Sequence, residues 1–166
     1  MDIEFANKRR RIIFNQGVLD HILGTSNHIR RIKEFFDFFK VTVRKDQVEK
    51  NHFFLITKDG KKRTDVFIED DFVVNREKGG IMSFTKKVGG IILYSNDLSE
   101  VLTNVKSFTF IDNGIYFIVV ELSSGNKRIY SKDLKQSTVA FKGGFEIIEG
   151  ELRTWDNEDI YKWKLT

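Results

Sequence analysis

Three glycine pairs stand beside lysines and lead into apolar segments, a pattern that could bind phosphate. They are Gly79-Gly80, Gly89-Gly90 and Gly143-Gly144. A phosphate-binding P-loop requires Gly-Lys followed by Ser or Thr, and a dinucleotide fingerprint requires glycines at positions i, i+2 and i+5. Neither spacing occurs at these pairs. Because glycine tolerates positive φ angles, we expect the pairs to turn or bulge strands, and alanine at Gly80 or Gly144 to lower stability.

The residues that carry nucleophilic or metal chemistry are sparse. The chain has no cysteine, and its three histidines, His21, His28 and His52, lack the spacing of a metal site. A magnesium-dependent nuclease needs carboxylates and a lysine on neighbouring strands. The set Asp112, Glu121, Asp133 and Lys135 matches that pattern only loosely. We therefore expect no metal or other cofactor, and a nuclease is the weaker alternative.

Clusters of lysine and arginine are the strongest chemical feature of the sequence. The densest is Lys8, Arg9, Arg10 and Arg11, four consecutive cations that can contact several phosphates. Further pairs and triplets are Arg30 and Arg31, Lys61, Lys62 and Arg63, Lys86 and Lys87, and Lys127 with Arg128. The first eleven of these residues, Lys8 to Lys87, form our predicted nucleic-acid-binding set.

The positive charge is concentrated near the N-terminus. The net charge is +4, and residues 1–50 hold eleven Lys/Arg against seven Asp/Glu, so the rest of the chain is neutral. This segregation indicates a polyanionic partner, and duplex DNA is our leading expectation. The alternative from another class is an inhibitor or immunity factor that binds a host or toxin protein by shape and charge.

Two helices are expected to present part of this basic segment. Residues 16–24, ending at Gly24, and residues 25–40, capped by Thr25, Ser26 or Asn27, have helical patterns. On a helical wheel, one broad face of the second segment holds Ile29, Ile32, Phe35, Phe36 and Phe39. A DNA-binding helix-turn-helix fits poorly, since Asp20 and Thr25 stand where small and apolar residues are normal, so a plain helical hairpin is favoured.

From residue 40 onward the pattern changes to short strands. Apolar runs separated by tight turns, including Asp59-Gly60 and Asn113-Gly114, predict antiparallel hairpins. Residues 96–105 are expected to form a short helix capped by Asn96, and residues 157–165 a closing helix or last strand. The predicted fold class is α+β, with an N-terminal helical hairpin packed on an antiparallel sheet or partly open barrel.

Composition bounds the remaining expectations. The length of 166 residues fits one domain, with a subdivision into residues 1–45 and 46–166 as the variant. No apolar run reaches membrane-spanning length, so we expect a cytoplasmic protein with no membrane partner. The absence of proline and the scarcity of alanine indicate an AT-rich genome, such as that of a phage or mobile element. The predicted function is a non-enzymatic, DNA-binding accessory or regulatory protein.

Overall fold

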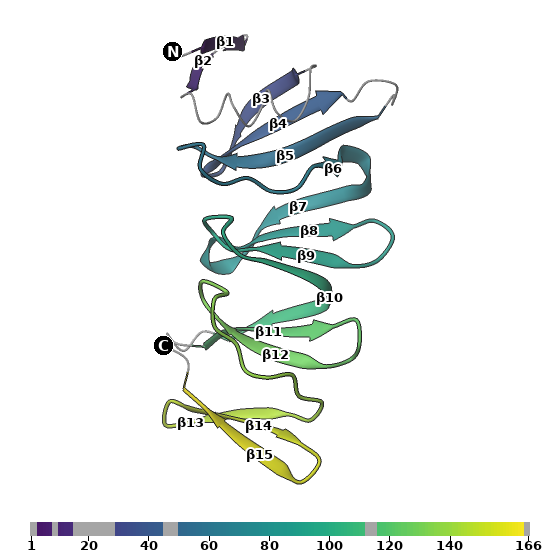
Figure 1. The fold of residues 1–166 in the computed structure, drawn as a ribbon, viewed down its shortest axis with the longest axis vertical. Helices are drawn as coiled ribbons and strands as arrows, with labels where there is room; N and C mark the ends of the chain where they lie inside the picture. The colour runs from purple at the N-terminus through teal and green to yellow at the C-terminus, as the bar shows by residue number, and fades with distance from the viewer. Residues whose placement is uncertain (1–2, 8–9, 15–28, 45–49, 112–115, 165–166) are drawn as a thin grey trace. The chain divides into compact units, whose positions relative to one another are not determined.

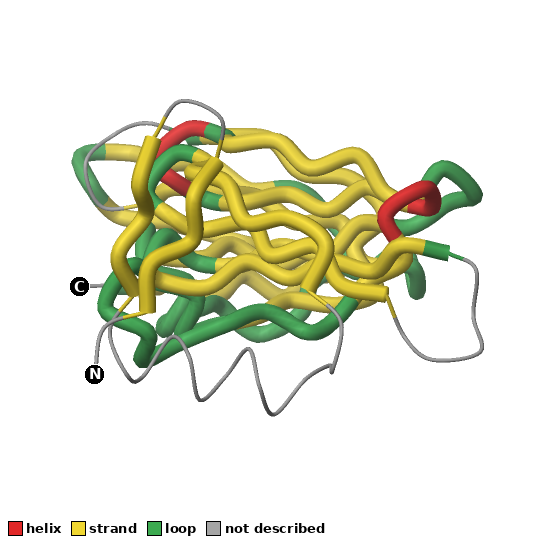
Figure 2. The backbone as a smooth tube through the Cα atoms, turned by 90° about the horizontal axis from the view of Figure 1, so that it is seen from above, coloured by secondary structure: helices red, strands yellow, loops and turns green. Residues whose placement is uncertain are grey.

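The computed structural model describes residues 3–7, 10–14, 29–44, 50–111 and 116–164. The chain divides into two compact units, Met1–Phe72 and Val73–Thr166. Strands dominate both units, and the helical segments among the described residues are two short 3-10 turns (Figure 2). Each unit is described by itself.

The first unit contains a hairpin and a four-stranded antiparallel sheet (Figure 1). The hairpin pairs β1 (Ile3–Asn7) with β2 (Arg10–Phe14). The sheet has the order β3 (Ile29–Phe35), β4 (Phe38–Arg44), β5 (Asn51–Thr57) and β6 (Phe67–Ile68). The 3-10 turn η1 (Glu69–Asp71) follows β6.

The predicted α+β fold class, with its N-terminal helical hairpin, is wrong, because the described residues form open antiparallel sheets. Residues 29–35 and 38–44 are paired strands, and residues 15–28 lie outside the described residues. A β-bulge between Ile29 and Arg31 explains the misleading pattern, because it inserts one residue into β3. Ile29 and Ile32, three apart, therefore face the same side, pairing with Val43 and Val41. A bulged strand thus imitates the spacing of a helix face.

Both faces of this sheet are buried in its middle. One face carries the cluster of Ile32, Phe39, Val41, Val43, Phe54 and Ile56. On the other face Phe38, Phe53 and Leu55 are at most 3% exposed. Burial on both sides explains why β5 reads as a continuous apolar run instead of an alternating one.

The second unit is built on a six-stranded antiparallel sheet. Its order is β12 (Lys127–Ser131), β11 (Tyr116–Leu122), β10 (Val101–Phe110), β9 (Ile91–Tyr94), β8 (Met82–Lys86) and β7 (Phe72–Arg76). The 3-10 turn η2 (Lys78–Gly80) joins β7 to β8. The core between these strands includes Ile81, Leu93, Val105, Ile118 and Val120, all fully buried.

The helix predicted over residues 96–105 is also wrong, because a turn and then the first half of β10 occupy this segment. The first half of β10 pairs with β9, from Val101 to Val105, and its second half pairs with β11. Asn104, with a φ of 57°, lies where the β9–β10 pairing shifts register, and the β10–β11 pairing shifts just after it, between Val105 and Ser107. One long strand therefore links two successive hairpins.

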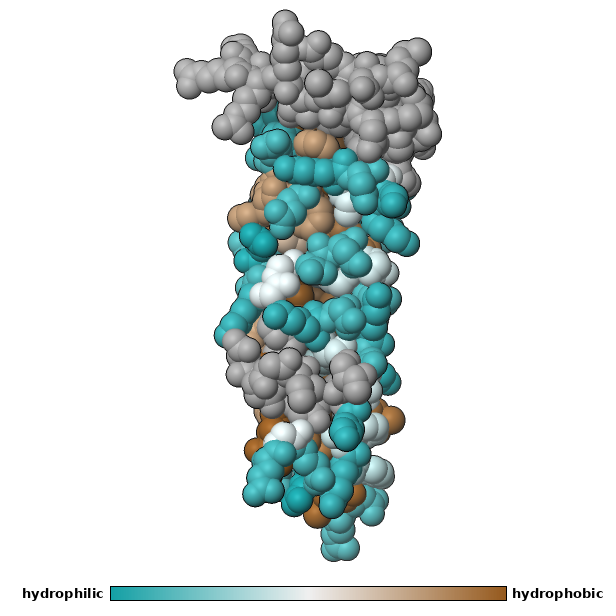
Figure 3. All heavy atoms as spheres, turned by 90° about the vertical axis from the view of Figure 1, so that its left-hand side faces the viewer, coloured by the Kyte–Doolittle hydropathy of each residue, from teal (hydrophilic) through white to brown (hydrophobic). Residues whose placement is uncertain are grey.

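A three-stranded sheet ends the second unit. Its order is β13 (Phe145–Ile148), β14 (Glu151–Asp156) and β15 (Asp159–Trp163), which confirms the strand alternative for the last segment. Leu152 on one face packs with Ile129 and Phe141. The other face carries Arg153, which forms ion pairs with Glu146 and Glu151. Hydrophobic patches also reach the surface around these strands, including the exposed Ile148 and Ile160 (Figure 3).

Among the described residues, one turn with the same hydrogen bonds occurs three times and is the repeated unit of the fold. Residues 154–157 have the same residue types, but there the Asp156 carboxylate accepts from the Lys142 backbone N–H. The copies begin at Thr57, Ser95 and Ser131, which are 38 and 36 residues apart. Each has Ser or Thr first, Asp third and a residue with positive φ fourth. The fourth residues are Gly60 at 73°, Leu98 at 61° and Leu134 at 63°. A buried apolar residue precedes each copy by two positions, as Leu55, Leu93 and Ile129.

The hydrogen bonds of the three turns match one another. The first hydroxyl donates to the Asp carboxylate at 2.6 Å from Thr57, 2.8 Å from Ser95 and 2.7 Å from Ser131. The same carboxylate accepts the backbone N–H two residues later at 2.9, 3.0 and 3.0 Å. The first residue's backbone N–H donates to the sixth residue's carbonyl at 2.9 Å in all three. Three equal turns therefore reverse the chain after β5, β9 and β12.

The glycine pairs act as backbone devices, for two different reasons. Gly79, Gly80, Gly89 and Gly90 have φ between 70° and 89°, as expected of turn glycines. Gly143 and Gly144 are different, because the indole and backbone of Trp155 pack directly against them. A Cβ on Gly143 would lie 2.1 Å from the Trp155 carbonyl oxygen, and one on Gly144 would lie 2.5 Å from its ring. For Gly144, close packing replaces the positive φ that we expected.

This difference predicts unequal costs for alanine. Gly143→Ala should lower the free energy of unfolding by about 3 kcal/mol, because the backbone contact with Trp155 has no flexible partner that can yield. Gly125→Ala is the matched control, since Gly125 has a φ of 85° but open space around its Cβ position. Its cost should be about 1 kcal/mol. Urea unfolding measures both, and equal losses would contradict the packing role of Gly143.

Candidate nucleic-acid interface

The densest basic cluster lies partly on the first hairpin. Arg10 and Arg11 open β2, opposite Asn7 and Ala6 of β1. Lys8 and Arg9 lie outside the described residues. The cluster stays a predicted phosphate contact.

Arg30 and Arg31 lie on β3 and not on a helix. Arg30 is the residue at the β-bulge and is exposed. The Nη2 of Arg31 lies 3.8 Å from Glu69 Oε1, the same oxygen to which Lys40 Nζ donates at 3.1 Å. Sequence reasoning missed Lys40 because it treated this lysine as the last residue of a helix.

Lys61, Lys62 and Arg63 lie in the first copy of the repeated turn. All three are exposed, as is Lys58 in the same turn. The carboxylate of Asp59 accepts hydrogen bonds within the turn from Thr57 and from the backbone of Lys61. The Arg63 guanidinium stacks over Phe54 at 5.5 Å and donates to the Thr64 carbonyl at 3.0 Å. We call residues 57–64, with these cations on a rigid frame, the basic turn.

Lys86 and Lys87 lie at the tip between β8 and β9, where Gly89 and Gly90 complete the turn. Both lysines are exposed, and Val88 beside them is 94% exposed. The tip belongs to the second unit, whereas β3 and the basic turn belong to the first. Lys127 and Arg128 open β12, as predicted.

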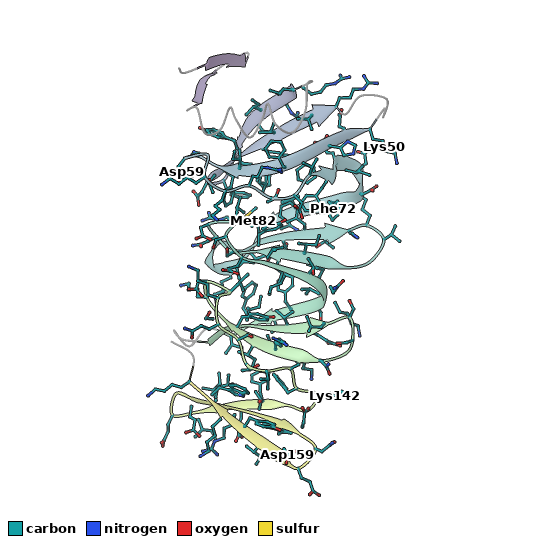
Figure 4. The ribbon with its side chains drawn as sticks, viewed as in Figure 1. Lys50, Asp59, Phe72, Met82, Lys142 and Asp159 are labelled. Atoms are coloured by element: carbon teal, nitrogen blue, oxygen red, sulfur yellow. The ribbon has the colours of Figure 1, made fainter. Side chains whose placement is uncertain are left out.

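Within the first unit, the arginines of β3 and the basic turn lie apart along the sheet. Phe38 pairs with Thr57 at one end of β5, whereas Val43 pairs with His52 at the other. Figure 4 shows Asp59 in the turn at one end of β5 and Lys50 at the opposite end. Arg31 pairs with Thr42, four strand positions from the turn, which is about 13 Å at a rise of about 3.3 Å per residue. They form two sites and not one patch.

Two residues of the nuclease alternative, Glu121 and Asp133, make local structural contacts. Glu121 accepts from Lys106 Nζ at 3.2 Å and pairs with Lys127 in the β11–β12 register. Asp133 holds the third repeated turn, beyond the opposite end of β12. Asp112 lies outside the described residues. Among the residues that the structure describes, no group of three or more His, Cys, Asp or Glu side chains could hold a metal ion.

His52 is a packed strand residue. It is 8% exposed, and its Nδ1 donates to the Lys50 carbonyl at 3.0 Å. This placement suits the structural role that we expected, and His21 and His28 lie outside the described residues. Within the described ranges, no helix is long and apolar enough to cross a membrane.

The aspartates of the repeated turns are held in their ionised form. The Ser99 hydroxyl and backbone N–H, with the Ser95 hydroxyl, lower the pKa of Asp97 to about 2 against the opposing effect of burial. The pKa of Asp59 is lowered chiefly by the Thr57 hydroxyl, and that of Asp133 by the Ser131 hydroxyl. Each carboxylate favours the charged form because the donors around it stabilise a negative acceptor.

No family model, no curated protein and no solved structure matches this chain. Function must therefore be inferred from the chain's own residues and their arrangement.

The turn aspartates predict a specific acid sensitivity. The pKa of Asp97 is lower in the folded state than its ordinary 3.8, so its contribution to stability is complete above that value. It is lost as the pH falls from about 4 toward 2. In the Asp97→Asn variant, the free energy of unfolding should therefore fall less steeply over this interval. Parallel pH profiles for parent and variant, from chemical unfolding, would refute the role of Asp97.

Proposed function

We propose that the protein is a non-enzymatic nucleic-acid-binding accessory protein that holds duplex DNA by its phosphates, in regulation or genome handling. The observation that carries the proposal is the basic turn. It displays four exposed cations, Lys58, Lys61, Lys62 and Arg63, within six residues. Its aspartate is engaged in the hydrogen bonds of the turn itself. A rigid turn reduces the entropy lost when its lysines meet a ligand.

Charge placement supports the same proposal. Phosphate contacts by lysine and arginine supply affinity and positioning but carry no sequence information. The basic turn, the tip at Lys86 and Lys87, and the N-terminal cluster offer contacts of this kind. In this proposal the protein binds many duplexes with similar affinity, and the binding weakens steeply with salt.

The basic turn offers a test with an internal control. Lys61→Ala with Lys62→Ala should weaken duplex binding and reduce the log–log salt slope by about 0.9 for each phosphate that the variant no longer neutralises. The control is Lys132→Ala with Lys135→Ala, which removes the same charge from the third copy of the same turn. Fluorescence anisotropy across salt measures both. If the control double variant loses as much affinity as the test variant, charge alone and not the basic turn explains binding.

The N-terminal cluster gives a second test of the proposal. Replacing Lys8, Arg9, Arg10 and Arg11 with alanine should weaken binding to all duplexes alike and lower the salt slope. An electrophoretic shift series with duplex DNA, single strands and RNA measures the effect. An unchanged slope would remove the cluster from the interface. Absence of duplex binding by the parent protein at moderate salt would instead favour a protein partner.

A further inference from the structure

One face of the β3–β4 pair carries more positive charge than its neighbours balance. Lys33 and Lys40 are directly opposed across the two strands, and Arg31 lies two residues before Lys33 on the same face. Like charges that are directly opposed destabilise a sheet. The carboxylate near them is that of Glu69, whose Oε1 contacts Lys40 at 3.1 Å and Arg31 at 3.8 Å. Three cations therefore share one described carboxylate.

The Lys40–Glu69 pair is partly closed to water, whereas the Arg31 side chain at its edge is 54% exposed. The Lys40 side chain is 15% exposed and that of Glu69 is 25% exposed. The Lys40 ammonium also lies 4.7 Å from the centre of the Phe53 ring. Burial and the neighbouring Lys40 and Arg31 lower the pKa of Lys33, and Glu69 opposes this shift. Coulombic attraction for an anion is stronger at such a site than on open surface.

An independent observation comes from Thr42. Its side chain lies on the same face, because Thr42 pairs with Arg31 on one side and with Phe53 on the other. The residue is 3% exposed, and its Oγ1 has no hydrogen-bond partner among the residues that the structure describes. A buried hydroxyl without a partner is costly and rare in folded proteins. It is a donor without an acceptor, next to an excess of cations.

We propose that this cluster is a phosphate-binding site, in which a phosphate group displaces Glu69 from Lys40 and Arg31 and accepts the Thr42 hydroxyl. In the unliganded state, Glu69 occupies the position of the anion. The residues are Arg31, Lys33, Lys40 and Thr42, with Glu69 as the competing internal carboxylate. The phosphate belongs either to a nucleic-acid backbone, in which case the inference rests on the proposed function, or to a free phosphate compound.

Thr42→Val separates this proposal from a structural role. Removing an unpartnered buried hydroxyl should raise the melting temperature without ligand by about 2 °C. The same change should weaken binding of inorganic phosphate about tenfold, since it deletes a donor to a charged acceptor. The matched control is Thr64→Val, because Thr64 Oγ1 accepts the Leu55 backbone N–H at 3.0 Å. The control should lower the melting temperature and leave phosphate binding unchanged.

The measurement is the melting temperature in sodium phosphate against sodium chloride at equal ionic strength and pH, which reports ligand binding by mass action. Phosphate also stabilises proteins non-specifically, and the variants share that effect, so their differences isolate the site. Arg31→Ala should abolish the specific shift. Glu69→Gln should tighten phosphate binding about tenfold or more, since it removes the competing charge.

A short duplex oligonucleotide distinguishes the two sources of phosphate. If inorganic phosphate competes with the duplex and Arg31→Ala weakens both, the site takes backbone phosphate. If Arg31→Ala removes the phosphate effect but leaves duplex affinity intact, the site binds free phosphate and not the nucleic-acid backbone. Its link to the proposed function then fails. Superimposed phosphate and chloride curves for both the parent and Glu69→Gln would overturn the proposal. A phosphate effect that survives in both Thr42→Val and Arg31→Ala would overturn it too.

Discussion

The three aspartate-centred turns are the constraint on which the rest of the structure depends. A single carboxylate accepts a hydroxyl from two residues before it and a backbone N–H from two residues after it. These bonds close the turn, and the fourth residue takes a positive φ that its side chain must tolerate. Leu98 and Leu134 do so while 5% and 4% exposed, so burial of the leucine offsets the strained backbone.

The turns also fix how each hairpin is completed by the segment that follows. After the first turn, Thr64 bonds with both backbone groups of Leu55, and after the third, Thr138 does the same with Ile129. The middle copy has Leu102 at this position, which pairs with Leu93 as part of a full strand. The same frame therefore carries either a strand or an irregular segment, and its exposed positions can vary without altering the chain path.

Much of the strand content was predictable, because alternation and tight turns are local signals. The two helix predictions failed for identifiable reasons. On β3 the bulge at Ile29 and Arg31 gave an apolar spacing of three, which periodicity alone assigns to a helix. At residues 96–100, Asn, Asp and Ser resemble a helix cap, but the Asp97 carboxylate accepts from the Ser95 hydroxyl and the Ser99 backbone N–H and so closes a turn. The recurrence of Ser/Thr-x-Asp at Thr57, Ser95, Ser131 and Thr154 was the sequence signal that could have corrected the second error.

The candidate site was predictable only in part. Its essential feature is that like charges and an unpartnered hydroxyl lie close together, and strand pairing brings them there. Arg31 was identifiable as a cation, but its proximity to Lys40 and Thr42 depends on the register of β3 against β4. Elsewhere the local rules agree: the turn donors have acceptors, and Arg153 on β14 lies between two carboxylates. Opposed lysines and an unpartnered hydroxyl break those rules together on one face. Since folded chains satisfy such groups wherever function permits, a shared violation is better explained by a ligand than by chance.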